Sequence, residues 1–178
     1  MWTLASGVGL DTAGYTPLTS YNGASCGLAG LQAFTDPGGL PSVSHNATGG
    51  TLTNTAGTCS SPFTIPMGAI TVHPLTRDVV TEWTSPMNGF VTVTGTLTDA
   101  DTNGGDGVAW QLGAGAGGTA LAELAHGSLP NGGSSTIEAA SVTRIPVSRG
   151  TVIALVVTAN GTTAFDATNV ALTVTPVA

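Results

Sequence analysis

From residue 67 onward, apolar and polar side chains alternate in short runs that predict β-strands. The alternation is strict over 89–98, where Val91, Val93 and Leu97 share one face and threonines occupy the other. The run VIALVV (152–157) is apolar on both faces, which predicts a central strand covered on both sides. Runs of this kind recur at near-even spacing and predict strands at 69–73, 78–84, 89–98, 107–113, 119–126, 135–147, 150–158 and 169–176.

Turns rich in glycine, proline and asparagine separate these runs, as in SPMNG (85–89) and LPNGG (129–133). The segment 119–126 has some helical propensity, but its position between glycine-rich turns favours a strand. About eight short strands with a turn every 8–12 residues or so are typical of an all-β fold. The pattern therefore predicts an antiparallel β-sandwich, specifically a jelly roll.

Residues 1–66 are less regular, because Gly, Pro, Asn and Ser are dense there and apolar pieces are short. We expect a loop-rich N-terminal part with two or three short strands, followed by regular strands over 67–178. At 178 residues the whole chain fits one β-sandwich domain, 1–178, with a sizeable core.

Both cysteines, Cys26 and Cys59, fall in this loop-rich part, among Gly, Ser and Thr residues that offer little other anchorage. A disulfide between them closes a loop of about 30 residues, worth about 3–4 kcal/mol on the chain-entropy model. The alternative is two unrelated buried thiols. The sequence favours a disulfide that ties the N-terminal part.

Charge is sparse and acidic, with 7% charged residues, three arginines, no lysine and a net charge of −7. This balance excludes nucleic acid and anionic membrane surfaces as partners, because nothing in the chain could neutralise rows of phosphates. No apolar run reaches the ~18 residues of a membrane span, so we expect no membrane insertion. The start MWTLASGVGL does not read as a signal peptide, so we expect a mature or excised domain, or a virion-type protein that needs no signal.

The stretch TDADTNGGDGVAW (98–110) concentrates polar side chains that suit a hard metal ion. Asp99, Asp101 and Asn103 are spaced like the first half of an EF-hand loop, but the twelfth position is Trp110 instead of Glu. In a β-sandwich, Asp106 and the distant Asp166 could complete such a site. The sequence favours a solvated hairpin turn over 98–110, and the alternative, which is the best functional use of the loop, is calcium bound by Asp99, Asp101, Asn103, Asp106 and Asp166.

Signs of catalysis are weak. The same carboxylates could form an acid–base pair only if they faced each other across a cleft. GASCG (23–27) matches the nucleophile pattern around Ser25, but no strand–turn–helix context surrounds it. His45, His73 and His126 have no metal-ligand spacing, and the sequons at Asn46 and Asn160 arise easily by chance in a Thr-rich chain. We expect no enzymatic activity.

Aromatic residues are few, and their positions suggest different roles. Trp83 and Trp110 lie within predicted strands and are expected in the core. Trp2, Tyr15 and Tyr21 lie in the loop-rich part, where they could stack on sugar rings, so we take them as candidate ligand-binding residues.

A longer pattern runs from His73 to Trp110, and it consists of His73-Pro74, Trp83, Pro86, Gly89, Gly95, Asp99 and Gly105-Asp106-Gly107-Val108. It resembles a β-sandwich module common in secreted bacterial proteins, which also occurs beside glycoside hydrolases and is similar to galactose-binding and carbohydrate-binding jelly rolls. Near the C-terminus the module's usual Gly-Asp and Tyr-Asp-Thr are replaced by Arg149-Gly150 and Phe165-Asp166. The resemblance implies the fold, and it implies that Asp99, Asp101, Asp106 and Asp166 lie together.

These observations predict a non-catalytic extracellular or cell-surface module that binds a polysaccharide or glycan, stabilised by calcium. The alternative is a self-assembling structural subunit of a virion exterior or a surface filament, because jelly rolls also build capsids.

Overall fold

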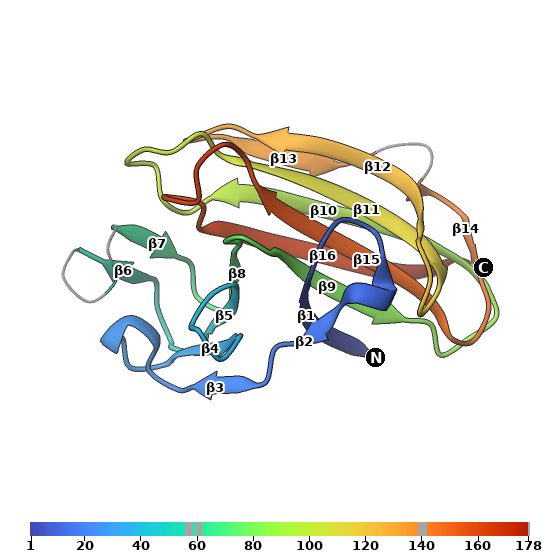
Figure 1. Ribbon diagram of the computed structural model, residues 1–178, viewed down its shortest axis with the longest axis horizontal. Helices are drawn as coiled ribbons and strands as arrows, with labels where there is room; N and C mark the ends of the chain where they lie inside the picture. Colours follow the sequence, from blue (N-terminus) through green and yellow to red (C-terminus); the bar gives the residue numbers. More distant parts are fainter. Residues whose placement is uncertain (56–58, 60–61, 139–141, 178) are drawn as a thin grey trace.

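The computed structural model is an all-β protein with two antiparallel sheets packed face to face (Figure 1). It describes residues 1–55, 59, 62–138 and 142–177. Within these residues no helix is long and apolar enough to cross a membrane. The predicted β-sandwich is confirmed.

The strands from β8 onward form the predicted jelly roll. One sheet has the order β13-β10-β16-β8, the other has the order β12-β11-β15-β9, and every pairing is antiparallel. Of these eight strands, successive ones alternate between the two sheets except β11 and β12, which pair in one sheet, as in two interleaved Greek keys. The bounds are β8 Ile70–His73, β9 Asp78–Thr84, β10 Gly89–Asp99, β11 Val108–Ala116, β12 Ala122–Leu129, β13 Ser134–Ile137, β15 Thr151–Ala159 and β16 Thr168–Val177.

Most predicted strands are present, but one of them is divided. The segment 135–147 holds two strands, β13 and β14 (Ile145–Val147), which pair with different parts of β10. Residues 139–141 of the predicted strand lie outside the described residues. The segment predicted as a strand at 119–126 is a strand, displaced to 122–129.

The expectation of only two or three N-terminal strands is wrong, because the described part of 1–66 holds seven. Two of them extend the β12-β11-β15-β9 sheet, three extend the β13-β10-β16-β8 sheet, and two form a separate ribbon. They are β1 Trp2–Gly7, β2 Thr16–Pro17, β3 Ser20–Asn22, β4 Leu31–Thr35, β5 Ser42–Asn46, β6 Leu52–Asn54 and β7 Phe63–Ile65. Two of them pair with strands beyond residue 66, β1 with β9 and β5 with β8, and such non-local partners are not visible in the local pattern.

Two short 3-10 turns, η1 (Thr12–Gly14) and η2 (Ser25–Gly27), interrupt this part. In Figure 1 the strands β3 to β7, blue to green, gather at one end of the sandwich.

The core lies between the two sheets, and β15 contributes to it from a central position. Val91, Val93 and Leu97 of β10 are fully buried there, as the alternation predicts. The other face of β15 is also buried, in a second cluster with β1 and β9 that Leu10 and Tyr15 cover. This second cover explains why the VIALVV run is apolar on both faces.

Asn46 at the end of β5 is a buried hydrogen-bonding centre for the turns around it. Its side chain is fully buried, and its Nδ2 donates to the carbonyl oxygens of Gly50, Ile65 and Pro66 at 2.9–3.1 Å. Its Oδ1 accepts from the backbone N and the hydroxyl of Thr48. The side chain of the sequon asparagine is therefore engaged in hydrogen bonds within the fold.

Asn46→Ala should lower the free energy of unfolding by about 3 kcal/mol, because several buried carbonyl and amide groups lose their partner. Urea denaturation of both proteins measures this loss. Asn22→Ala is the matched control, since Asn22 is exposed and its side chain accepts one bond, from Ala24 N. An equal and small effect of the two variants would contradict the role of Asn46.

Candidate functional site

Two loops meet at the end of the sandwich where β10 and β15 finish: the β10–β11 loop (100–107) and the β15–β16 loop (160–167). Asp106 joins them, because its carboxylate accepts hydrogen bonds from Gly161 N at 2.7 Å and from the N and Oγ1 of Thr162. Desolvation opposes ionisation of Asp106, but these hydrogen bonds outweigh it and lower its pKa. Asp106 therefore locks one loop to the other.

Asp99 has a similar positioning role on the neighbouring turn. Its Oδ1 accepts from Asp101 N at 2.9 Å, and its Oδ2 accepts from Gly132 N at 2.6 Å. Asn131 also donates to Gly104 O, so the β12–β13 turn is held against the β10–β11 loop. Asp99 and Asp106 thus satisfy backbone N–H groups.

Asp101 and Asp166 differ from these two, because their carboxylates are buried and largely unpaired. Asp101 is 0% exposed and Asp166 is 1% exposed. Within the described residues, Asp101 Oδ2 and both carboxylate oxygens of Asp166 have no hydrogen-bond partner. Burial, together with the charges of Asp106 and Asp99, raises the pKa of Asp166 to about 7.

The four aspartates predicted to bind metal thus lie close together along adjoining loops. Two of them are bonded to backbone amides, and the other two are buried and largely unpaired. The fifth predicted residue, Asn103, is exposed and donates from Nδ2 to Pro62 O at 3.3 Å and to Asp101 Oδ1 at 3.4 Å. Among the described residues, no three His, Cys, Asp or Glu side chains converge as a metal-binding group. Any cation here has to rely on fewer carboxylates and on other oxygen atoms.

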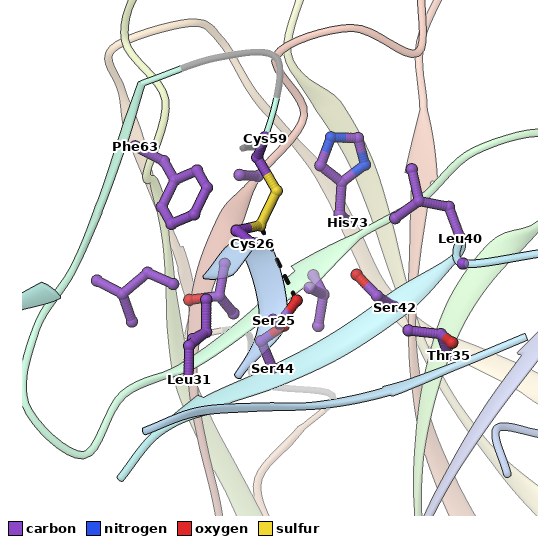
Figure 2. A pocket seen from close by; sticks show the side chains of 15 residues that line it. Ser25, Cys26, Leu31, Thr35, Leu40, Ser42, Ser44, Cys59, Phe63 and His73 are labelled. Carbon is purple, nitrogen blue, oxygen red and sulfur yellow. Dashed lines mark hydrogen bonds between the residues drawn. A yellow bond between two sulfur atoms is a disulfide. The ribbon is translucent and has the colours of Figure 1, made fainter. Parts of the chain in front are cut away.

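A cavity of about 460 Å³ lies on the face of β4, β5 and β8 that is turned away from the sandwich core (Figure 2). The register pairs Ser42 with His73 and Ser44 with Thr71, so these four side chains share that face. Val43, on the opposite face, packs in the core. Sequence reasoning missed this cavity, although the alternating serines of PSVSHN (41–46) are a signal for a polar strand face.

Several polar atoms of the cavity are available to a ligand. Among the described residues, the hydroxyls of Ser42 and Ser44 have no recorded hydrogen-bond partner, although each residue is only 9% exposed. Burial lowers the pKa of His73, whose Nδ1 lies 2.8 Å from Pro74 O. A neutral imidazole that donates from Nδ1 keeps Nε2 as an acceptor.

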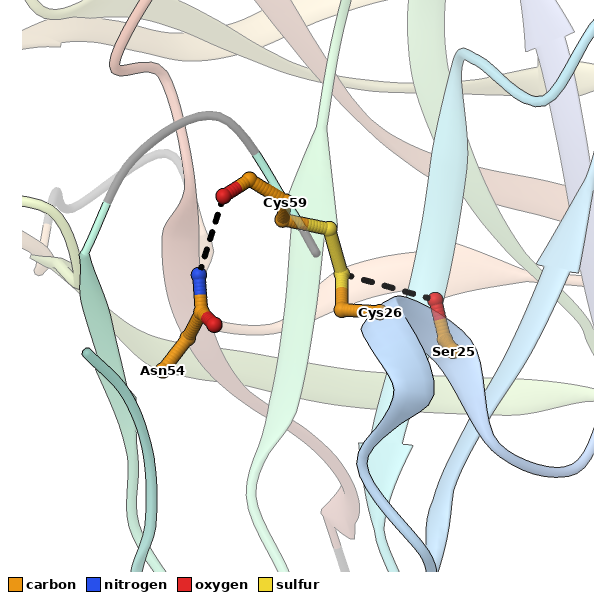
Figure 3. The surroundings of a disulfide bond; sticks show 4 residues. All are labelled: Ser25, Cys26, Asn54 and Cys59. Carbon is orange, nitrogen blue, oxygen red and sulfur yellow. Dashed lines mark hydrogen bonds between the residues drawn. A yellow bond between two sulfur atoms is a disulfide. The ribbon is translucent and has the colours of Figure 1, made fainter. Parts of the chain in front are cut away.

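The predicted disulfide between Cys26 and Cys59 is confirmed, and it forms part of the cavity wall. It joins η2 to the segment before β7, with the two Cα atoms 5.1 Å apart. Asn54 Nδ2 donates to Cys59 O at 3.4 Å, which ties the same segment to β6 (Figure 3). In Figure 2 the disulfide is seen between Phe63 and His73.

The three aromatic residues predicted to bind ligand do not form one site. Tyr15 packs onto Gly7 and donates to Gly9 O at 2.7 Å, and burial raises its pKa, so it serves the fold. Trp2, 47% exposed, borders an apolar groove between the sheets, whereas Tyr21, 58% exposed, pairs with Phe34 on the β3–β4 edge.

The candidate nucleophile Ser25 also lines the cavity, but its hydroxyl lies 3.9 Å from Cys26 Sγ in the irregular turn η2. Among the described hydrogen bonds, none joins Ser25 to His73. His126 pairs with Glu123 at the surface. The side chains of a nucleophile and a base are therefore near one cavity without being coupled.

No protein-family model matches the sequence, and no curated protein is significantly similar to it.

In buffer that contains EDTA, the contribution of Asp166 to the free energy of unfolding should fall as the pH rises from about 4 to about 7. Between these values folded Asp166 holds a proton that the unfolded chain, with an ordinary pKa of 3.8, has released. Asp166→Asn should remove this decline, which we expect to be about 2–4 kcal/mol. Urea denaturation across the pH range measures it, and Asp11→Asn, at an exposed turn, is the control. Parallel pH profiles for wild type and Asp166→Asn would contradict the prediction.

Reduction of the disulfide should lower the free energy of unfolding by about 3–4 kcal/mol, because the bond spans 33 residues of sequence. Guanidinium denaturation with and without a phosphine reductant tests this. The double variant Cys26→Ser/Cys59→Ser is the control, since the reductant should leave it unaffected. An unchanged wild-type midpoint after verified reduction would refute the stabilising role.

Proposed function

We propose that this protein is a non-catalytic extracellular binding module that holds a saccharide unit in the cavity above β4, β5 and β8. The observation that carries the proposal is the pair of unpartnered hydroxyls, Ser42 and Ser44, on a cavity face shared with His73. Hydroxyls that face a cavity and have no described protein partner can donate to and accept from the hydroxyls of a ligand.

The cavity has the size and mixed chemistry that a sugar ring needs. Its volume of about 460 Å³ lies within the usual range of small-molecule sites. Phe63, Leu31 and Ile65 offer apolar surface for the C–H faces of a pyranose, and the serines offer donors and acceptors for its hydroxyls.

Two further observations support a binding module outside the cell. Disulfides persist mainly in oxidising compartments, and this one forms part of the cavity wall. The resemblance of residues 73–110 to secreted carbohydrate-binding modules points in the same direction. Binding without chemistry is favoured because Ser25 and His73, which line the same cavity, are not coupled by any described hydrogen bond.

The proposal is tested by titrating the purified protein with a panel of monosaccharides and oligosaccharides in a calorimeter. We expect one class of sugar to bind, and Ser42→Ala/Ser44→Ala to weaken that binding by at least about tenfold. The control is Thr94→Ala/Thr173→Ala, which removes two exposed hydroxyls that face each other on β10 and β16. Absence of binding across the panel, or equal affinities of the two double variants, would reject the cavity as a saccharide site.

A second candidate function is that of a structural subunit of a virion exterior or filament. The outer face of β10 and β16 favours it, because Thr92, Thr94, Thr173 and Thr175 form an uncharged, hydroxyl-rich surface. Light scattering after size exclusion separates the two functions. A large, defined assembly without sugar binding would favour the structural subunit, and a monomer that binds sugar would exclude it.

A further inference from the structure

Asp101 and Asp166 occupy opposed positions at the end of the β10–β16 pairing. The ladder ends with Asp99 paired to Thr168, and Ala100 N donates to Ala167 O at 2.8 Å, which extends the register by one residue. In that register the next opposed positions are Asp101 and Asp166. Both have the parity of Leu97 and Thr168, which are buried at the interior face of the sheet.

Among the described residues no arginine reaches this buried pair, and the basic side chain that interacts with Asp101 is His73, whose pKa is lowered by burial. The three arginines are the chain's only permanently charged basic side chains. Arg77 donates to Ser6 and Gly14, Arg144 lies over the ring of Phe90, and Arg149 lies in the turn before β15, at the opposite end of the sandwich. The one salt bridge among the described residues joins His126 to Glu123 at the surface. Burying carboxylates without a counter-charge is unfavourable, so a proton or a cation from solution has to neutralise this pair.

The loops that carry Asp101 and Asp166 pack closely at Gly105, where there is little room for a side chain. Gly105 has φ +85°, and a Cβ there would lie 2.7 Å from Ala164 O and 3.4 Å from Phe165 O, so the two loops touch through backbone. Asp99 and Asp106 already satisfy backbone N–H groups and hold both loops in place. Backbone carbonyls and carboxylates are the donors that Ca²⁺ prefers, with six to eight oxygens or so around the ion.

We infer that Asp101 and Asp166 bind one hard divalent cation of the Ca²⁺ class between the β10–β11 and β15–β16 loops. Main-chain carbonyl oxygens and water complete its coordination, so the site needs no third carboxylate. Asp99 and Asp106 are positioning residues of this site, because their oxygens face backbone amides. Of the half EF-hand pattern, only Asp101 remains a metal ligand in this assignment. The second ligand, Asp166, lies about 65 residues further along the sequence.

The same loop also touches the wall of the cavity, which links the cation to ligand binding. Thr64 N donates to Ala100 O at 2.9 Å, and Asn103 Nδ2 donates to Pro62 O. These contacts flank Phe63, which lines the cavity, and Ala167, next to Asp166, lines it as well. Cation binding should therefore order the Phe63 side of the cavity and strengthen saccharide binding, a consequence that rests on the proposed function.

The cation site is tested without any sugar, on the full chain after EDTA treatment and removal of the chelator. Calorimetric titration with CaCl₂ should show one site per chain, and calcium should raise the unfolding temperature. Asp101→Asn and Asp166→Asn should each weaken binding by at least about tenfold, because each removes one charged ligand. Asp11→Asn, which removes the same charge from an exposed turn, should change the affinity by less than about twofold.

Circular dichroism confirms that each variant is folded before titration. Absence of calcium binding up to about 10 mM, well above the range of extracellular calcium modules, would overturn the inference. So would unchanged affinities of Asp101→Asn and Asp166→Asn. A wild type indifferent to calcium, with Asp166→Asn more stable, would assign Asp166 to a neutral buried acid instead.

Repeating the sugar titration in calcium and in EDTA separates this inference from the proposed function. Calcium binding without sugar binding would keep the cation site and reject the saccharide cavity. Sugar binding that is equal in calcium and EDTA would reject the coupling between the two sites.

Discussion

The antiparallel pairing of β10 with β16 is the interaction on which the rest of the structure depends. It runs from Phe90 and Val177 to Asp99 and Thr168, and it joins the middle of the chain to its last strand. β16 then pairs with β8 on its other side, and the N-terminal strands β5, β4 and β3 continue that sheet. Because this ladder is non-local, its formation requires the ordering of the loops between its strands. It also sets which loops meet at the acidic end.

The N-terminal part gives this jelly roll a second polar surface beyond its core. β5 pairs with β8, so Ser42, Ser44 and Thr71 face away from the sandwich, and the β6–β7 ribbon covers them. Asn169 of β16 accepts from Thr71 and donates to Thr64 O, so the ribbon is fastened directly to the central ladder. The disulfide closes the other side. The cavity is thus a product of edge strands and a covalent tie added outside the eight-stranded jelly roll.

Because the chain has three arginines and ten acidic side chains, most carboxylates have to be stabilised without a basic partner. The carboxylates of Asp99 and Asp106 accept hydrogen bonds from backbone N–H groups, which stabilise their negative charge without a basic side chain. Asp101 and Asp166 are buried without that stabilisation, and burial shifts the pKa of Asp166 toward neutrality. A chain with no lysine has few means to neutralise such a pair internally. This constraint makes the acidic end sensitive to protons and to cations from solution.

Local pattern was enough to establish the regular strands, since the alternation of Val91, Val93 and Leu97 reflects one buried face. It also indicated that Asp99, Asp101 and Asp106 belong to one loop and that Cys26 and Cys59 form a disulfide. It failed for most of the N-terminal strands, of which β1 and β5 are paired with the distant strands β9 and β8.

Only the tertiary structure decided which aspartates are satisfied by backbone amides and which remain unpaired. It alone showed that Ser42 and Ser44 line a cavity and that Tyr15 packs against Gly7. The physical reason is that periodicity reports which face of a strand is buried. Which distant strand or loop covers that face depends on non-local pairing, and local sequence does not encode it.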